Sequence, residues 1–195
     1  QPITVIDVGC GTGHSSCEMA KNFPNIRVIG VDYHAPSISK AKHLLHVSGQ
    51  TNVEFVVGDS SSKTWHGTGE ADVTTFFDCW HDMEDPAEAC RQAYTALKPD
   101  GIAVVIDPHG AELPGVQNKL DSPLTPVFAG CSSFLCTPTS LGSEGTGAGF
   151  GACIPTEFHK KLFMDAGFKS VEVMVGDNGP MSPTANGFRF IVARK

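Results

Sequence analysis

The chain has 195 residues, of which 41% are hydrophobic and 18% are charged, and its formal net charge at pH 7 is −7. These proportions are typical of one globular domain with a core of its own, so we treat residues 1–195 as a single domain. The negative charge argues against nucleic acid as the main partner, because a protein that neutralises phosphates needs a basic surface.

Membrane and metal partners are not expected either. No apolar run approaches the ~20 residues of a membrane span, and no signal peptide is visible. The seven cysteines lack the spacing of a zinc site. We therefore expect free thiols in a reducing compartment, the cytoplasm.

Apolar runs alternate with helical patterns along the chain, which indicates βαβ units and a mainly parallel sheet. The predicted strands are residues 3–8, 26–31, 53–57, 71–77, 102–106, 171–175 and 187–192. The predicted helices are residues 14–22, 36–47, 86–97 and 155–166. The fold class that follows is α/β, a doubly wound, mostly parallel, seven-stranded Rossmann-like sheet that ends in an antiparallel hairpin.

Residues 108–153 interrupt this alternation. Prolines at 108, 114, 123, 126 and 138 argue against a long regular helix across the segment. Phe128, Phe134 and Phe150 give it enough apolar side chains to pack on the rest of the domain. We expect a flap-like insertion that borders a binding site.

The first predicted strand runs directly into a turn with glycine at alternate positions, Gly9, Gly11 and Gly13. Glycine carries no Cβ, so a ligand can lie against the bare backbone there. Asp32 ends the second predicted strand, where a carboxylate is placed to accept hydrogen bonds from ribose hydroxyls. Together these features predict an adenosine-containing cofactor.

The glycine spacing and Asp7 narrow the choice of cofactor. A dinucleotide turn reads G-x-G-x-x-G, whereas this chain reads G-x-G-x-G with Asp7 two residues before the first glycine. A carboxylate there repels a pyrophosphate and favours an ammonium or sulfonium group, both of which S-adenosylmethionine (SAM) carries. The segment DVGCGTG resembles the first motif, E/D-x-G-x-G-x-G, of the class I SAM-dependent methyltransferases. A nicotinamide or flavin site is the alternative.

The resemblance implies a SAM site along the glycine turn and the carboxyl ends of the first four parallel strands. The expected cofactor-binding residues are Asp7, Gly9, Cys10, Gly11, Thr12, Gly13, Asp32, Tyr33, Asp59, Ser60, Phe77, Asp78 and Trp80. It implies that Asp59 accepts from the adenine amino group, although aspartate is also common in an ordinary turn after a strand. Cys10 is interpreted as a small apolar filler rather than a reactive thiol.

The segment after the fourth predicted strand, residues 76–82, supplies the remaining candidates. The resemblance places Phe77 and Asp78 near the methionine part of SAM. Trp80 could stack on the adenine or shield the sulfonium, and the alternative is a tryptophan of the core. His81 is the candidate general base, because an ordinary pKa of ~6.5 allows it to take a proton from a hydroxyl or amine.

The function expected is methyl transfer from SAM to an oxygen or nitrogen of a small-molecule acceptor. Such a displacement needs no covalent intermediate, so positioning of the acceptor and methyl group could carry the reaction without a base. The alternative function is a module of a regulatory protein that binds SAM without catalysis, or only dimerises.

A narrower likeness lies in FFDCWHDMEDP, LKPDG and FLCTPTSL. These segments resemble methyltransferases labelled transcriptional-regulator-like, whose chains begin with a winged-helix domain that mediates dimerisation or caps the acceptor site. In that set the fifth strand usually ends in a glutamate before proline, and here Asp107 precedes Pro108. The chain starts at Gln1 almost directly in a strand, so we expect a piece of a longer protein that could form a homodimer.

Overall fold

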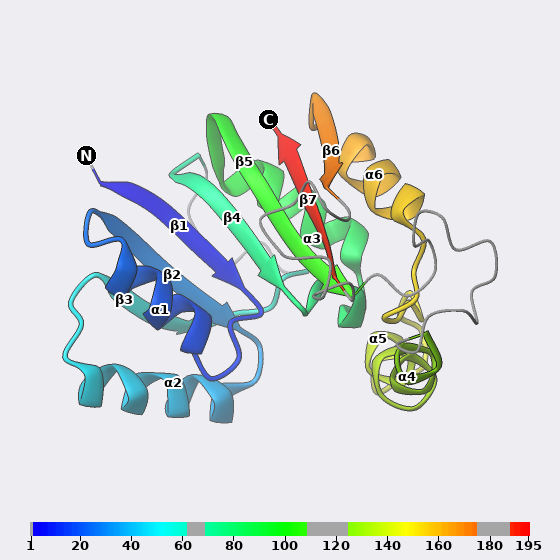
Figure 1. Ribbon diagram of the computed structural model, residues 1–195, viewed down its shortest axis with the longest axis horizontal. Coiled ribbons are helices and arrows are strands. Elements are labelled where there is room, and N and C mark those ends of the chain that lie inside the picture. Colours follow the sequence, from blue (N-terminus) through cyan, green and yellow to red (C-terminus); the bar gives the residue numbers. More distant parts are fainter. Residues whose placement is uncertain (1, 62–68, 109–124, 175–187) are drawn as a thin grey trace.

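A computed structural model of the chain describes residues 2–61, 69–108, 125–174 and 188–195. Within these ranges seven strands form one sheet in the order β3-β2-β1-β4-β5-β7-β6 (Figure 1). The strands are β1 Ile3–Val8, β2 Ile26–Asp32, β3 Val53–Val57, β4 Ala71–Phe77, β5 Leu97–Pro108, β6 Ser170–Met174 and β7 Phe188–Arg194. The first five pair in parallel, and β7 pairs antiparallel with both β5 and β6. The predicted α/β fold with its antiparallel hairpin is confirmed.

Helices cover both faces of the sheet. The long helices are α1 His14–Asn22, α2 Ala35–Ser48, α3 Pro86–Ala96 and α6 Thr156–Asp165. Helices α1 and α2 pack on the β1–β3 side of one face, and α3 and α6 pack together on the other. Successive side chains of a strand point to opposite faces, so Val5 of β1 enters the core under α1 and α2 while Ile6 and Val8 enter the core under α3.

Local signals in the sequence account for the helix that follows β4. The Asp85 side chain accepts a hydrogen bond of 2.8 Å from the Glu88 backbone N–H, which makes it the N-cap of α3. Pro86 occupies the first turn, where a missing N–H costs nothing. A short 3₁₀ turn, η1 (Trp80–Asp82), lies between β4 and this helix.

The segment predicted as a flap is helical over residues 125–141 and has no helix over residues 142–153. Helix α4 (Thr125–Cys131) continues into a π-helical turn, η2 (Ser132–Cys136), and then into α5 (Thr137–Leu141). The prolines therefore left more helix than we expected. Pro126 lies in the first turn of α4, and Pro138 follows the π turn, which already interrupts the regular hydrogen bonding. Pro114 and Pro123 lie outside the described residues.

Helices α4 and α5 lie beyond the carboxyl ends of the parallel strands (Figure 1). This is the edge at which ligands bind in doubly wound sheets. None of the seven cysteines, all of which lie within the described residues, forms a disulfide. Across the described ranges, no helix combines the length and apolar character that a bilayer crossing requires.

Candidate functional site

The turn after β1 is held in a conformation that favours glycine. Gly9, Gly11 and Gly13 all have positive φ, at 69°, 55° and 83°. A Cβ on Gly9 would lie 2.7 Å from Cys79 Sγ, and one on Gly13 would lie 2.5 Å from a ring carbon of Phe55. A Cβ on Gly11 would meet nothing within 4 Å. The loop therefore packs tightly at its two ends and leaves open space at its middle.

Replacing Gly9 with alanine is expected to lower the free energy of unfolding by about 2 to 4 kcal/mol, since the strained φ and the overlap with Cys79 add. Gly11→Ala is the matched control, because it shares the positive φ without the overlap and is expected to cost about half as much. Denaturant unfolding of both variants measures the difference. Equal losses would contradict a packing role for Cys79, and Cys79→Gly in the Gly9→Ala background is expected to recover part of the loss.

Asp32, at the end of β2, holds the glycine loop Gly9–Gly13 by a hydrogen bond to its backbone. Its Oδ2 accepts a hydrogen bond of 2.8 Å from the Gly11 N–H, and its Oδ1 accepts one of 2.8 Å from the His34 N–H. The side chain is 9% exposed and lines a cavity beside the loop. Each carboxylate oxygen can accept a second hydrogen bond, so Asp32 can hold the loop and contact a ligand at the same time.

Asp7 lies beneath the loop rather than in the cavity, contrary to the direct role in attracting a cation that we expected. Its Oδ2 accepts hydrogen bonds from Ser15 Oγ and Ser16 Oγ at 2.8 and 2.6 Å, and its Oδ1 accepts one from Thr75 Oγ1 at 2.8 Å. Burial raises the pKa of Asp7 above its ordinary value, and the three hydroxyl groups offset this only in part. Asp7 therefore joins β1 to α1 and β4.

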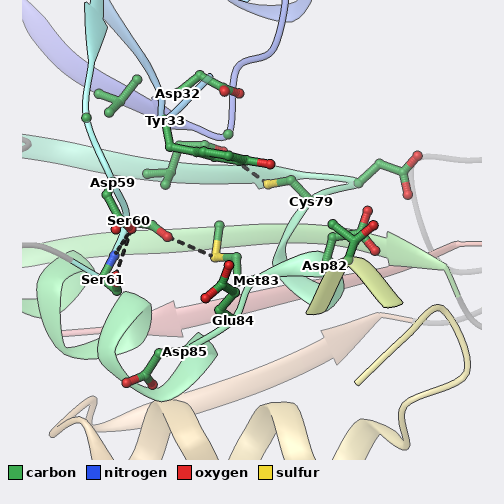
Figure 2. Close-up of a pocket in the computed structure, with 16 residues that line it drawn as sticks. Asp32, Tyr33, Asp59, Ser60, Ser61, Cys79, Asp82, Met83, Glu84 and Asp85 are labelled. Carbon is green, nitrogen blue, oxygen red and sulfur yellow. Dashed lines mark hydrogen bonds between the residues drawn. The ribbon is translucent and has the colours of Figure 1, made fainter. Parts of the chain in front are cut away.

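The cavity encloses about 270 Å³ at the carboxyl ends of β1, β2 and β4 (Figure 2). It is lined by Val8, Gly9, Val31, Asp32, Tyr33, Gly58, Asp59, Ser60, Ser61, Asp78, Cys79, Asp82, Met83, Glu84, Asp85 and Thr139. Six of these side chains are carboxylates, and within the part of the chain that the structure describes no lysine, arginine or histidine lines the cavity. The cavity is therefore suited to a positively charged guest.

The end of β3 contributes a tight turn to this cavity. Asp59 Oδ1 accepts hydrogen bonds of 2.8 Å from both the N–H and the Oγ of Ser61. Figure 2 shows the Ser60 hydroxyl directed at the Met83 sulfur, at 3.5 Å. Asp59 thus makes an ordinary turn after a strand, and it also faces the cavity. Its role in the turn therefore does not exclude the expected contact with the adenine amino group.

The structure brings some of the expected cofactor residues together and leaves others apart. Gly9, Asp32, Tyr33, Asp59, Ser60 and Asp78 line the cavity. Asp7, Cys10, Gly11, Thr12, Gly13, Phe77 and Trp80 do not line it. Cys10 is buried, and burial raises the pKa of its thiol, which agrees with a small apolar filler.

Trp80 is a core residue, so its expected contact with the cofactor is corrected. Its side chain is 0% exposed and stacks on the His159 ring with centroids 4.2 Å apart. Phe163 and Phe150 lie at centroid distances of 6.3 and 6.0 Å. The 3₁₀ turn after β4 directs the tryptophan inward, beneath α6, rather than toward the cavity.

Shortening Trp80 to alanine is expected to cost about 3 to 5 kcal/mol of unfolding free energy, because a fully buried aromatic side chain leaves a cavity. Trp80→Phe is the control that keeps most of the packing, and it is expected to leave cofactor affinity unchanged. Thermal unfolding and titration calorimetry measure the two effects. If a stable Trp80→Phe protein lost much of its affinity for the cofactor, the expected contact between Trp80 and the cofactor would be supported after all.

A buried hydrogen-bond network lies next to the cavity. His81 Nδ1 is 2.9 Å from Asp107 Oδ1, and His159 Nε2 is 3.2 Å from Asp107 Oδ2. The three side chains are 3%, 0% and 0% exposed. The other nitrogen of His81, Nε2, lies 3.2 Å from Oδ1 of Asp82, which lines the cavity.

The environments of the two histidines shift their pKa values in opposite directions. Burial lowers the pKa of His81, but the hydrogen bond and charge of Asp107, with Asp82 and Asp78, raise it above the ordinary value overall. Burial and the positive charge of Arg189 lower the pKa of His159 despite its bond to Asp107. Burial also acts to raise the pKa of Asp107, but the two histidines outweigh it, so this carboxyl stays ionised.

Several cavity residues were not anticipated. Cys79 and Asp82 to Asp85 fall in the segment FFDCWHDMEDP, which pointed to the site without showing which side chains face it. Thr139 comes from α5, a short helix that no sequence pattern predicted. Cys79 Sγ donates to the Val8 carbonyl at 3.1 Å, a contact between strand ends that no sequence pattern marks.

The chain is similar in sequence to known proteins. Residues 2–137 match a family model described as "Methyltransferase domain". A malonyl-(acyl-carrier protein) O-methyltransferase of Halalkalibacterium halodurans is 30% identical over 110 residues, which cover 52% of this chain and 38% of that protein. Phosphoethanolamine N-methyltransferase 3 of Arabidopsis thaliana is 36% identical over 104 residues, which cover 53% of this chain and 20% of that protein.

Solved structures share the fold. An O-methyltransferase family protein from Burkholderia thailandensis superposes with a TM-score of 0.66 at 18% identity, covering 100% of this chain and 51% of that one. The YcgJ protein from Bacillus subtilis gives a TM-score of 0.71 at 16% identity, with 92% of its chain covered. The chain spans less than half the length of the two curated relatives named above.

Proposed function

Because this chain belongs to the methyltransferase domain family, we propose that it transfers the methyl group of SAM to an oxygen or nitrogen atom of a small molecule. The observation that carries the proposal is the cavity beside the glycine turn: among the described residues its lining holds six carboxylates and no basic side chain. Related proteins support both acceptor atoms, since one is named an O-methyltransferase and another an N-methyltransferase.

The residues present fit SAM rather than a dinucleotide. The carboxylates of the cavity complement a sulfonium and an ammonium group, and they would repel a pyrophosphate. Asp32 would accept from the ribose hydroxyls, Asp59 from the adenine amino group, and the bare backbone at Gly11 leaves room for close approach.

When bound, SAM supplies an activated methyl group. The protein would then hold the acceptor in line with it and keep water out. His81 donates its Nδ1–H to Asp107, which leaves Nε2 as the acceptor of the proton that the substrate oxygen or nitrogen gives up. Because Nε2 lies 3.2 Å from a carboxylate of the cavity lining, His81 is placed at the edge of the cofactor site.

The test uses the 195-residue chain with SAM, NADH and a panel of small hydroxyl and amine acceptors. Calorimetry is expected to show binding of SAM and no binding of NADH. Formation of S-adenosylhomocysteine with one acceptor class would establish turnover. Binding of NADH in place of SAM would overturn the cofactor assignment.

The second candidate is a SAM-binding or dimerisation module of a regulatory protein. One observation favours it: Val127, Phe134 and Leu135, on α4 and η2, are 57%, 82% and 64% exposed. An apolar surface of this kind suits contact with a second copy or with a winged-helix domain, as in the regulator-like set that FFDCWHDMEDP resembles. SAM binding without turnover on any acceptor, together with a dimer in sedimentation, would favour this module.

A further inference from the structure

Asp107 is shared by two histidines from distant parts of the chain. His81 comes from the turn after β4 and His159 from α6, and each contacts a different oxygen of the carboxylate. Packing fixes the position of His159, since its ring stacks on Trp80 with centroids 4.2 Å apart and its side chain is fully buried. Trp80 precedes His81 in the chain, so the same stack also supports the backbone that carries His81.

Hydrogen-bonding rules fix where the protons lie. A neutral imidazole has one N–H, and an ionised carboxylate can only accept. His159 Nε2 faces Asp107 at 3.2 Å, whereas its Nδ1 lies 3.5 Å from the Pro155 carbonyl, at the limit of a hydrogen bond. The geometry therefore favours neutral His159 with its proton on Nε2.

Resting on the proposed function, in which His81 takes the proton, we propose that His159 is a positioning residue. Its Nε2–H occupies Oδ2 of Asp107, so Oδ1 remains for the Nδ1–H of His81. This arrangement holds His81 in the tautomer with its proton on Nδ1, which leaves Nε2, 3.2 Å from Asp82 Oδ1 of the cavity lining, without a proton. A wrong tautomer would present an N–H there and could not accept a proton.

The charges around the pair decide which histidine takes the proton. His81 is faced by Asp107 from β5, Asp82 from η1 and Asp78 from the end of β4. His159 is faced by Asp107 and by Arg189 of β7, which is itself 1% exposed and donates to the carbonyls of Pro108 and Ile154. A positive charge is thus favoured on His81 and disfavoured on His159, although the two rings are chemically identical.

The test reads the imidazole nitrogens directly, by ¹⁵N NMR of the 195-residue chain, and needs no acceptor. In the unmodified protein His159 is expected to be neutral with its proton on Nε2. His159→Leu removes the donor and keeps an apolar side chain. Asp107 then shares its charge with His81 alone, so the titration midpoint of His81 is expected to rise by roughly half a unit to one unit.

His159→Gln is the rescue variant, because its amide N–H can replace Nε2–H. It is expected to return the titration midpoint of His81 toward that of the unmodified protein. His46→Leu, on the exposed side of α2, is the control that should leave the His81 midpoint unchanged. The proposal is overturned by a proton on His159 Nδ1, or by an unchanged His81 midpoint in a folded His159→Leu protein. If His159→Leu does not fold, the position of the proton on His159 in the unmodified protein decides whether the proposal holds. Because none of these measurements uses turnover, failure of His81 as a base would be seen separately, in kinetics.

Discussion

Replacing His81 with alanine is expected to lower the rate of methyl transfer by roughly a hundredfold to ten-thousandfold, the usual contribution of a positioned general base. The affinity for SAM should change little, because His81 does not line the cofactor cavity. Steady-state formation of S-adenosylhomocysteine measures the rate, and calorimetry measures the affinity. An affinity loss as large as the rate loss would mean that His81 supports the fold of the site instead.

The pH profile gives the same prediction an independent check. His81 must be neutral to accept a proton, and its environment raises its pKa above the ordinary value. The rate of the unmodified enzyme should therefore increase with pH through a midpoint above ~6.5, where the imidazolium gives up its proton. The rate of His81→Ala should not show this rise with pH, and the rate of His46→Ala, changed on an exposed helix face, should still show it. Turnover near that of the unmodified enzyme at every pH would show that positioning alone carries the reaction.

Asp32→Ala is expected to weaken SAM binding by about tenfold to a hundredfold or more, the loss of one or more hydrogen bonds to a charged group. Two effects combine. The carboxylate that would contact the ribose disappears, and the N–H groups of Gly11 and His34 lose their acceptor. Titration calorimetry with SAM measures the change.

Two variants separate these effects. Asp32→Asn keeps one acceptor oxygen for the loop and removes the charge, so it should lose less affinity than Asp32→Ala. Glu54→Ala removes an exposed carboxylate of β3 that pairs with Arg27 outside the cavity, and it should leave SAM binding unchanged. If Asp32→Ala binds SAM as tightly as the unmodified chain, the ribose role is wrong.

The sheet could be predicted from the sequence because its signals are local. Buried parallel strands are short apolar runs, and β1, β3 and β4 begin and end at the predicted residues. The start of α3 follows from the capping pair Asp85 and Pro86. The last two predicted strands differ from β6 and β7 by a residue or two at their ends, and residues 175–187 between them lie outside the described residues.

The site was less predictable because the direction of a side chain is a tertiary property. Asp7 and Trp80 occur in segments that reach the cavity, yet both point into the protein. Near a strand end or a 3₁₀ turn, a shift of one residue changes the face on which a side chain lies, and periodicity cannot resolve it. The link between His81 and His159 depends on α6 bringing His159 to Asp107 near the end of β5, which no local pattern encodes.

The six carboxylates that line the cavity also bear on how the proposed turnover would end. Donating its methyl converts a sulfonium into an uncharged thioether, so these acids lose part of their attraction for the spent molecule at that moment. If the chain uses SAM as proposed, the electrostatic field that attracts the donor would therefore hold the by-product less tightly. Weak inhibition by S-adenosylhomocysteine would be the kinetic evidence of this difference in charge.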